Sequence, residues 1–242
     1  MRLTDLARWM CSTLVVILPF AIMTASPSFA SEDVPAIECA TCSQVESTTA
    51  SFVEKIEALL DKSDYQAAIA ECNSEIDKNP GNAEAFYFRS LTQYYMHVNL
   101  NVVIADLNQA LTINPNYVDA LAGRAYVSRL MNDYQAAIAD LTQILALEPE
   151  NINALEERIA LHSEMQDMNG LVADFTHMIT LRPDDPDAYY NRAFCQKILG
   201  EKEKAIADFQ KAAELYLALH QEKNAEEAQQ EIAALQEATT SG

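Results

Sequence analysis

Glycine and basic residues are scarce in this chain, and each scarcity argues against a class of function. Only 5 of the 242 residues are glycine, which disfavours phosphate-binding loops and turn-rich β folds. Lysine and arginine number 16 against 36 aspartates and glutamates, and the net charge is −20. Such a charge repels phosphates and anionic lipid head groups. Nucleic acid and membrane surfaces are therefore poor partners, and basic or mixed apolar and basic proteins or peptides are better ones.

The sequence also lacks a constellation of residues for catalysis or metal binding. Its 4 histidines are His97, His162, His177 and His220, and no two of them form a ligand pair at helical spacing. No Ser/His/Asp arrangement can be singled out. We therefore expect no enzyme activity, no metal and no cofactor.

Cys39 and Cys42 form the single Cys-x-x-Cys pair. Glutamates at positions 38 and 46 would raise a thiol pKa, whereas a redox motif needs a stabilised thiolate after a strand. With no histidine nearby, the pair supplies half of a zinc site. We favour a small disulfide, with thiol exchange and metal binding as the alternatives.

No apolar run is as long as the roughly 20 residues that a membrane helix needs. The first 30 residues are instead typical of a secretory signal. Arg2 and Arg8 precede an apolar run over 12–25, and Ser28-Phe29-Ala30 is a small-x-small cleavage site. We expect export to a bacterial periplasm or secretion, with an uncleaved anchor as the alternative, and a flexible segment over 31–48.

What the chain does contain is a repeat of 34 or 35 residues. An arginine, the tetrapeptide Ile/Val-Ala-Asp-Leu/Phe and a proline return in step, the prolines being Pro80, Pro115, Pro149 and Pro183. A fixed period of this length is the signature of a solenoid. It predicts an all-α fold of stacked antiparallel helical hairpins. The predicted units are 49–82, 83–117, 118–151, 152–185 and 186–219, followed by a capping helix over 220–238 and a frayed tail over 239–242.

The unit 118–151 shows the pattern most clearly. Its first helix carries Leu121, Ala125 and Leu130 at helical spacing, and Asn132-Asp133 offers a cap for a second helix over 134–147. Pro149 predicts the end of that helix. Two helices of this length form a hairpin that cannot bury its faces alone.

The recurring arginine and aspartate of each unit lie at nearly equal distances from the predicted turn. Their side chains can therefore meet across the hairpin, as ion pairs that fix its register. A ladder of guanidinium groups for an acidic ligand is the alternative. The pairs are Arg89 with Asp106, Arg124 with Asp140, Arg158 with Asp174 and Arg192 with Asp208.

The period, the Asp133-Tyr134 turn, Ala137, Leu141 and Pro149 resemble the tetratricopeptide repeat family over residues 49–219. The resemblance implies a right-handed α-solenoid with a C-terminal capping helix, which binds peptides or proteins on the concave face of each unit's first helix. Carried over to this chain, the implied groove residues are Tyr87, Leu91, Tyr94, Tyr126, Arg129, Glu156, Tyr190 and Phe194.

These observations together predict an exported protein-interaction module, an adaptor or scaffold. A self-associating assembly scaffold is one alternative. A thiol-disulfide protein that uses Cys39 and Cys42 is the other.

Overall fold

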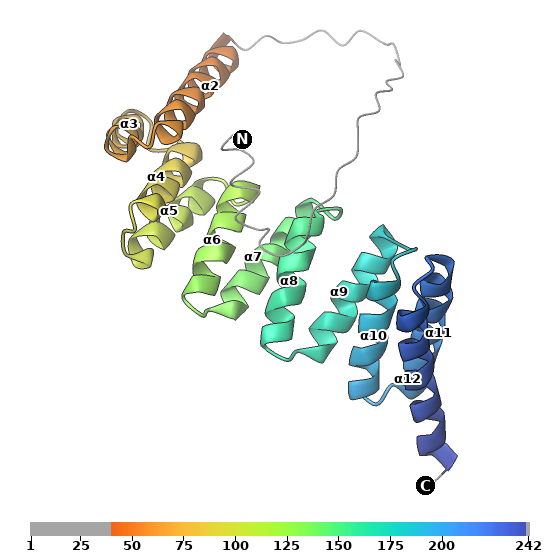
Figure 1. Cartoon of the computed structure of the whole chain (residues 1–242). Coiled ribbons are helices and arrows are strands. Elements are labelled where there is room, and N and C mark those ends of the chain that lie inside the picture. Colours follow the sequence, from red (N-terminus) through yellow and green to blue (C-terminus); the bar gives the residue numbers. More distant parts are fainter. Residues whose placement is uncertain (1–39, 241–242) are drawn as a thin grey trace, which may run out of the picture. The chain divides into compact units, whose positions relative to one another are not determined.

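The computed structural model describes residues 40–240, with side chains from 51 to 237. All secondary structure in this part of the chain is α-helical, and consecutive helices pair as hairpins (Figure 1). The all-α prediction of stacked helical hairpins is confirmed. The helices are α2 (Ala40–Asp61), α3 (Tyr65–Lys78), α4 (Ala83–Tyr95), α5 (Leu100–Ile113), α6 (Val118–Leu130), α7 (Tyr134–Leu147), α8 (Ile152–Glu164), α9 (Met168–Leu181), α10 (Pro186–Ile198), α11 (Lys202–Ala218) and α12 (Glu222–Thr240).

The helices belong to two compact units. Described residues up to Gly123 form the first unit, and residues from Arg124 onward form the second. The division falls within α6. None of the helices among the described residues is long and apolar enough to cross a membrane.

Short polar side chains define where most helices begin. Asp133 accepts a hydrogen bond from the Ala136 backbone N–H at 3.2 Å, and α7 starts at the next residue, Tyr134. Such a cap satisfies one of the donors that a helix leaves unpaired at its N-terminus. The same role falls to Asp64, Asn82, Asn99, Asn151, Asp167 and Asp185.

The turn inside each hairpin contains one residue in the left-handed backbone region. In the α10–α11 turn this residue is Gly200, with φ +79°. The other turns place a residue with a side chain there, at φ between 55° and 61°: Ser63, His97, Asn132, Gln166 and His220. Glycine adopts this conformation without steric cost, whereas other residues do so at some cost. Because most of these turns have no glycine at this position, the packing of the paired helices must impose the conformation.

The N-terminal boundary of the first hairpin differs from the sequence prediction. The segment 31–48 was expected to be flexible, with the first unit beginning at 49, but α2 already begins at Ala40. The stretch from 40 to 61 contains neither glycine nor proline. Nothing in the local sequence therefore stops the helix from extending upstream.

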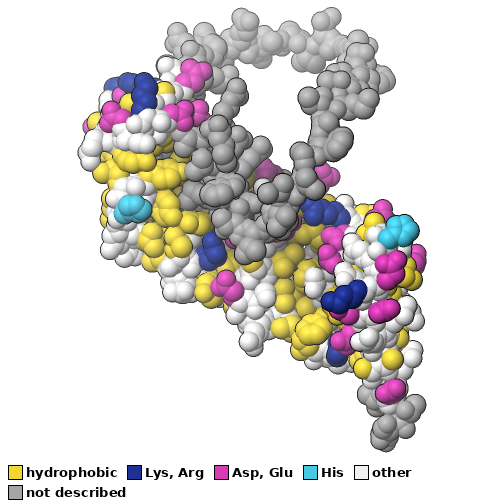
Figure 2. Space-filling model, in the orientation of Figure 1, with side chains coloured by type: hydrophobic (Ala, Val, Ile, Leu, Met, Phe, Trp, Pro, Cys, Tyr) yellow, Lys and Arg dark blue, Asp and Glu magenta, His cyan; other side chains and the backbone are white. Residues whose placement is uncertain are grey.

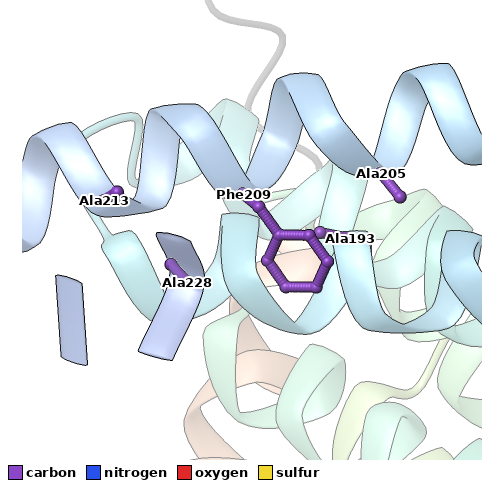
Figure 3. Close-up of a cluster of buried hydrophobic side chains, with 5 residues drawn as sticks. All are labelled: Ala193, Ala205, Phe209, Ala213 and Ala228. Atoms are coloured by element: carbon purple, nitrogen blue, oxygen red, sulfur yellow. The ribbon is translucent and has the colours of Figure 1, made fainter. Parts of the chain in front are cut away.

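The core cluster at the C-terminal end of the second unit is built from alanines around one aromatic ring. Phe209 of α11 is fully buried, and its ring lies against Ala193 of α10 (Figure 3). Ala228 brings α12 into the same cluster. The outward residues of α12, such as Glu226 and Gln230, are exposed. The last helix therefore covers the final hairpin with a polar surface.

Each recurring arginine binds the recurring aspartate of its own hairpin. Arg124 donates from Nε and Nη2 to the two carboxylate oxygens of Asp140, at 2.9 and 2.7 Å. The Asp140 side chain is 5% exposed, so the guanidinium compensates a charge that is almost out of contact with water. The pairs Arg89–Asp106, Arg158–Asp174 and Arg192–Asp208 lie at 2.5 to 2.7 Å.

Three of these arginines also contact the preceding hairpin. Arg158 and Arg192 donate from Nη1 to the hydroxyls of Thr142 and Thr176, at 3.0 and 3.1 Å. Arg89 makes the equivalent bond to Asn73 at 2.8 Å. The ion pairs therefore join neighbouring hairpins as well as the two helices of one hairpin.

Candidate functional site

The first helices of the second unit carry two aromatic side chains in equivalent positions. Tyr126 lies on α6 and Phe194 on α10, 68 residues or two repeat periods apart. Each is followed three residues later by a basic residue. We call the surface formed by these positions on α6, α8 and α10 the first-helix face, made of Tyr126, Arg129, Ala160, Ser163, Phe194 and Lys197.

Both aromatic rings have a cation above them. The Arg129 guanidinium lies 5.5 Å from the centroid of the Tyr126 ring, and the Lys197 ammonium lies 5.8 Å from that of Phe194. Each contact is within the range of a cation–π interaction. Phe194 is nevertheless 44% exposed and Tyr126 is partly exposed.

Arg129 and Lys197 also lie close to glutamates of other helices. Arg129 Nε lies 3.9 Å from Glu157 Oε2, and Lys197 Nζ lies 2.5 Å from Glu231 Oε2. The first distance is too long for a hydrogen bond, whereas the second is a close ion pair. Lys197 is therefore engaged in an ion pair within the protein, whereas Arg129 makes only a long contact, and both cations stay about one third exposed.

Helix α8 presents small residues where its neighbours present rings and cations. Ala160 and Ser163 occupy the positions equivalent to Tyr126 and Arg129, and both are exposed. The first-helix face therefore has aromatic side chains on α6 and α10 and small side chains on α8. Figure 2 shows hydrophobic side chains reaching the surface over α8 to α10.

Carboxylates accompany this face along α8. Burial raises the pKa of Glu157 above its ordinary value, Arg129 lowers it, and the charges of Glu164 and Glu156 raise it. Glu156 is the exposed neighbour, 3.8 Å from Arg182. The negative charge at Glu157 is thus incompletely compensated by the protein.

The first unit offers less of the expected site. Tyr87 is 7% exposed, because its ring packs edge-on against Phe88 and Tyr117 at 5.2 Å. The sequence placed it in the groove, and the structure corrects this: Tyr87 belongs to the core. Leu91 and Tyr94 are partly exposed. Glu84, on the same helix, has a buried Oε2 without a hydrogen-bond partner, and burial raises its pKa.

Tyr190 is partly exposed and also packs against the core of the last hairpin. Its ring packs against Phe209 at 5.2 Å and Tyr216 at 6.4 Å, and it joins the cluster that contains Ala228 of α12. The capping helix that the sequence predicts over 220–238 thus packs close to this residue. Tyr190 therefore helps to hold the last hairpin together, and its place in the groove stays a prediction.

The two cysteines whose side chains the structure describes are buried. Burial raises the pKa of Cys72 to about 12, and it also raises the pKa of Cys195, so both thiols stay protonated. No group of three or more metal-ligating side chains occurs among the described residues. Cys39 lies outside the described residues, and so does the side chain of Cys42.

Comparisons with known proteins agree with this architecture. The Tetratricopeptide repeat family matches residues 186–216, which form α10 and most of α11. None of the curated proteins compared matches the chain. A solved structure described as YrrB, "a TPR protein with an unusual peptide-binding site", is 18% identical with a TM-score of 0.53, covering 78% of this chain and 100% of that one.

Two further solved structures are similar. A crystal structure of MamA is 19% identical with a TM-score of 0.51, covering 68% of this chain and 96% of that one. A structure of Naa15/Naa10 bound to HypK-THB is 20% identical with a TM-score of 0.58, covering 66% of this chain and 24% of that one. At these identities the likeness is one of fold.

The tetratricopeptide fold is that of an interaction scaffold. The family match lies on the last hairpin, and the hairpins before it repeat the same residue spacing and the same Arg–Asp pairs. The described part of the chain is therefore an array of helical hairpins that is similar in fold to tetratricopeptide repeat proteins, and its last hairpin matches the family itself.

Proposed function

We propose that this chain is an exported protein-interaction module that binds a segment of another protein on the first-helix face. The observation that carries the proposal is the pair of aromatic–cation contacts, Tyr126–Arg129 and Phe194–Lys197, in equivalent positions two repeats apart. Aromatic side chains that are held in place and still partly exposed are typical anchors of protein interfaces. The similarity to a solved repeat protein with a peptide-binding site supports the same interpretation.

The proposed partner is basic, or mixed apolar and basic. The net charge of −20 speeds the association of a cationic partner and repels an anionic one. Glu157 supports this choice, because its contact with Arg129 is long, at 3.9 Å, and burial raises its pKa. A cation from a partner would relieve that electrostatic cost.

A photo-reactive amino acid at Ala160 tests the binding face. Ala160 is exposed and lies between the two aromatic positions. In the native extract, the full chain labelled at 160 should capture a discrete partner. The matched control carries the label at Leu217, which is 50% exposed on the second helix of the last hairpin. Equal capture from both positions would remove the first-helix face as the site.

Export is a separate part of the proposal, and it rests on the signal-like features of residues 1–30. The intact mass of the protein isolated from its source decides this part. A chain that begins at Ser31 is expected. A chain that retains Met1 in a cytosolic fraction would contradict export while leaving the binding face untouched.

A further inference from the structure

The imidazole of His162, on α8, lies between two carboxylates of the α9 side of its hairpin. Its Nδ1 is 3.0 Å from Asp167 Oδ2, and its Nε2 is 3.8 Å from Asp174 Oδ2. From this arrangement we propose that protonation of His162 locks α8 to the start of α9, so that this hairpin is held more tightly at mildly acidic pH than at alkaline pH. The lock does not depend on the proposed binding face.

The ion pair of this hairpin uses its carboxylate differently from the other three recurring pairs. In those pairs the guanidinium binds both carboxylate oxygens, as Arg124 does with Asp140. Arg158 instead donates from both Nε and Nη2 to Oδ1 of Asp174. The second oxygen, Oδ2, is buried without a hydrogen-bond partner, and the side chain of Asp174 is 1% exposed. This unsatisfied oxygen is the one that faces His162.

The position of His162 is one from which a side chain can donate to the buried aspartate. Gln93 and His162 are each the eleventh residue of a first helix, α4 and α8. Gln93 donates from Nε2 to Asp106 Oδ2 at 3.0 Å. A glutamine amide donates at any pH, whereas a histidine has a donor on both ring nitrogens only when it is protonated. Histidine at this position therefore makes the contact sensitive to pH.

The neutral ring cannot match both carboxylates at once. One of its nitrogens is then a hydrogen-bond acceptor, and that nitrogen would face a carboxylate oxygen, which is also an acceptor. Consistent with this conflict, Nδ1 is buried and makes no hydrogen bond, although Asp167 lies close to it. The imidazolium carries a donor on each side and attracts both carboxylates.

The charges around the ring favour its protonation. The titratable groups of the packed helices are Tyr134 and Asp140 of α7, Glu156, Glu157, Arg158 and Glu164 of α8, and Asp167, Asp174 and His177 of α9 with its cap. Of these, Asp167 and Asp174 approach the ring, and Arg158 binds the second. Arg158 and the burial of the ring oppose a further positive charge. The three side chains together carry a charge of −1, which the imidazolium neutralises.

Asp167 connects the ring to the first turn of α9. Its Oδ1 accepts the Gly170 backbone N–H at 3.1 Å, which caps the helix, and its Oδ2 faces His162. Gly170 allows this approach, because a Cβ atom there would overlap the imidazole. A histidine of an unfolded chain loses its proton at about pH 6.5. Because the two carboxylates meet the ring only in the folded hairpin, the stabilisation is present below that pH and is lost as the pH rises above it.

Amide hydrogen exchange of the full chain at about pH 5.5 and about pH 8, on either side of the ordinary histidine titration, tests the lock. After correction for intrinsic rates, amides in the first turn of α9 should exchange about three- to tenfold more slowly at the lower pH. His162→Gln supplies a neutral donor, as Gln93 does, and should remove this difference. His177→Gln changes another histidine of the same hairpin and should retain it.

Asp167→Asn provides a second test that does not alter the histidine. Asparagine also caps helices but carries no charge, so the helix start is kept while the attraction for the imidazolium is weakened. The difference in exchange between the two pH values should shrink in this variant. A difference that survives unchanged in either His162→Gln or Asp167→Asn overturns the inference. Equal loss of the difference in His177→Gln, or faster exchange of the natural chain at the lower pH, also overturns it.

Discussion

Arg158 of α8 donates a hydrogen bond from Nη1 to the hydroxyl of Thr142 in α7, at 3.0 Å. The same guanidinium binds Asp174 of its own hairpin, so one side chain connects three helices. Thr142→Val removes the hydroxyl and keeps the shape of the side chain. It should lower the free energy of unfolding by about 0.5 to 1.5 kcal/mol. Denaturant titration measures this, and the effect should vanish in an Arg158→Ala background.

Removing one partner of a recurring ion pair should lower the free energy of unfolding more than removing both partners does. Arg124→Ala leaves the Asp140 carboxylate, 5% exposed, without its guanidinium. We expect the free energy of unfolding to fall by roughly 2 to 4 kcal/mol. This is less than for a fully buried ion pair, because the Arg124 side chain is 28% exposed. The double variant with Asp140→Ala should lose less. If Arg124→Ala alone leaves the denaturant midpoint unchanged, the pair does not hold the hairpin register.

Gly170 and His162 should behave as a coupled pair. A Cβ atom at position 170 would overlap the imidazole ring of His162. Gly170→Ala in the natural chain should therefore destabilise by about 1 to 3 kcal/mol, as overpacking does. In a His162→Ala background the same change should stabilise by about 1 kcal/mol, because alanine is the better helix former. The change in sign, read from denaturant midpoints, is the diagnostic result; equal effects in both backgrounds would contradict the coupling.

Sequence periodicity predicted the part of the structure that each unit repeats. The spacing indicated which arginine meets which aspartate, and Pro149 predicted the end of α7 at Leu147. The burial of residues at positions that differ between units was harder to predict. Leu130 shares an apolar stripe with Leu121 and Ala125 in the sequence, yet it is 42% exposed near the α6–α7 turn.

The candidate site was less predictable because it depends on neighbouring side chains. Tyr87 occupies the fifth position of its first helix and Tyr126 the ninth, but the sequence alone does not tell that the first is in the core and the second partly exposed. The burial of Tyr87 depends on Tyr117, and the position of Tyr190 depends on α12. An aromatic residue followed by a basic residue three positions later recurs at 126 and 194, but the same spacing at 86 and 189 belongs to arginines that bind buried aspartates. The spacing alone therefore does not identify the site.

Glu84 makes folding stability depend on pH with a defined sign. Burial raises its pKa above the ordinary value of 4.5, so the folded protein holds this proton more tightly than the unfolded chain does. The contribution of Glu84 to stability therefore falls as the pH rises past 4.5. Glu84→Gln should raise the denaturant midpoint at pH 7, and the gain should shrink as the pH is lowered toward 4.5. Glu54→Gln, the same change at an exposed position of α2, is the control substitution.

The central claim is that Tyr126 and Phe194 anchor a partner segment on the first-helix face. Titration calorimetry of the segment captured from position 160 against alanine variants tests it most directly. Each aromatic variant should lose about 1 to 3 kcal/mol of binding free energy, which is typical of interface anchors. Leu217→Ala should bind as the natural chain does, and all variants should unfold at similar denaturant concentrations. Unchanged affinity in both Tyr126→Ala and Phe194→Ala would contradict the claim.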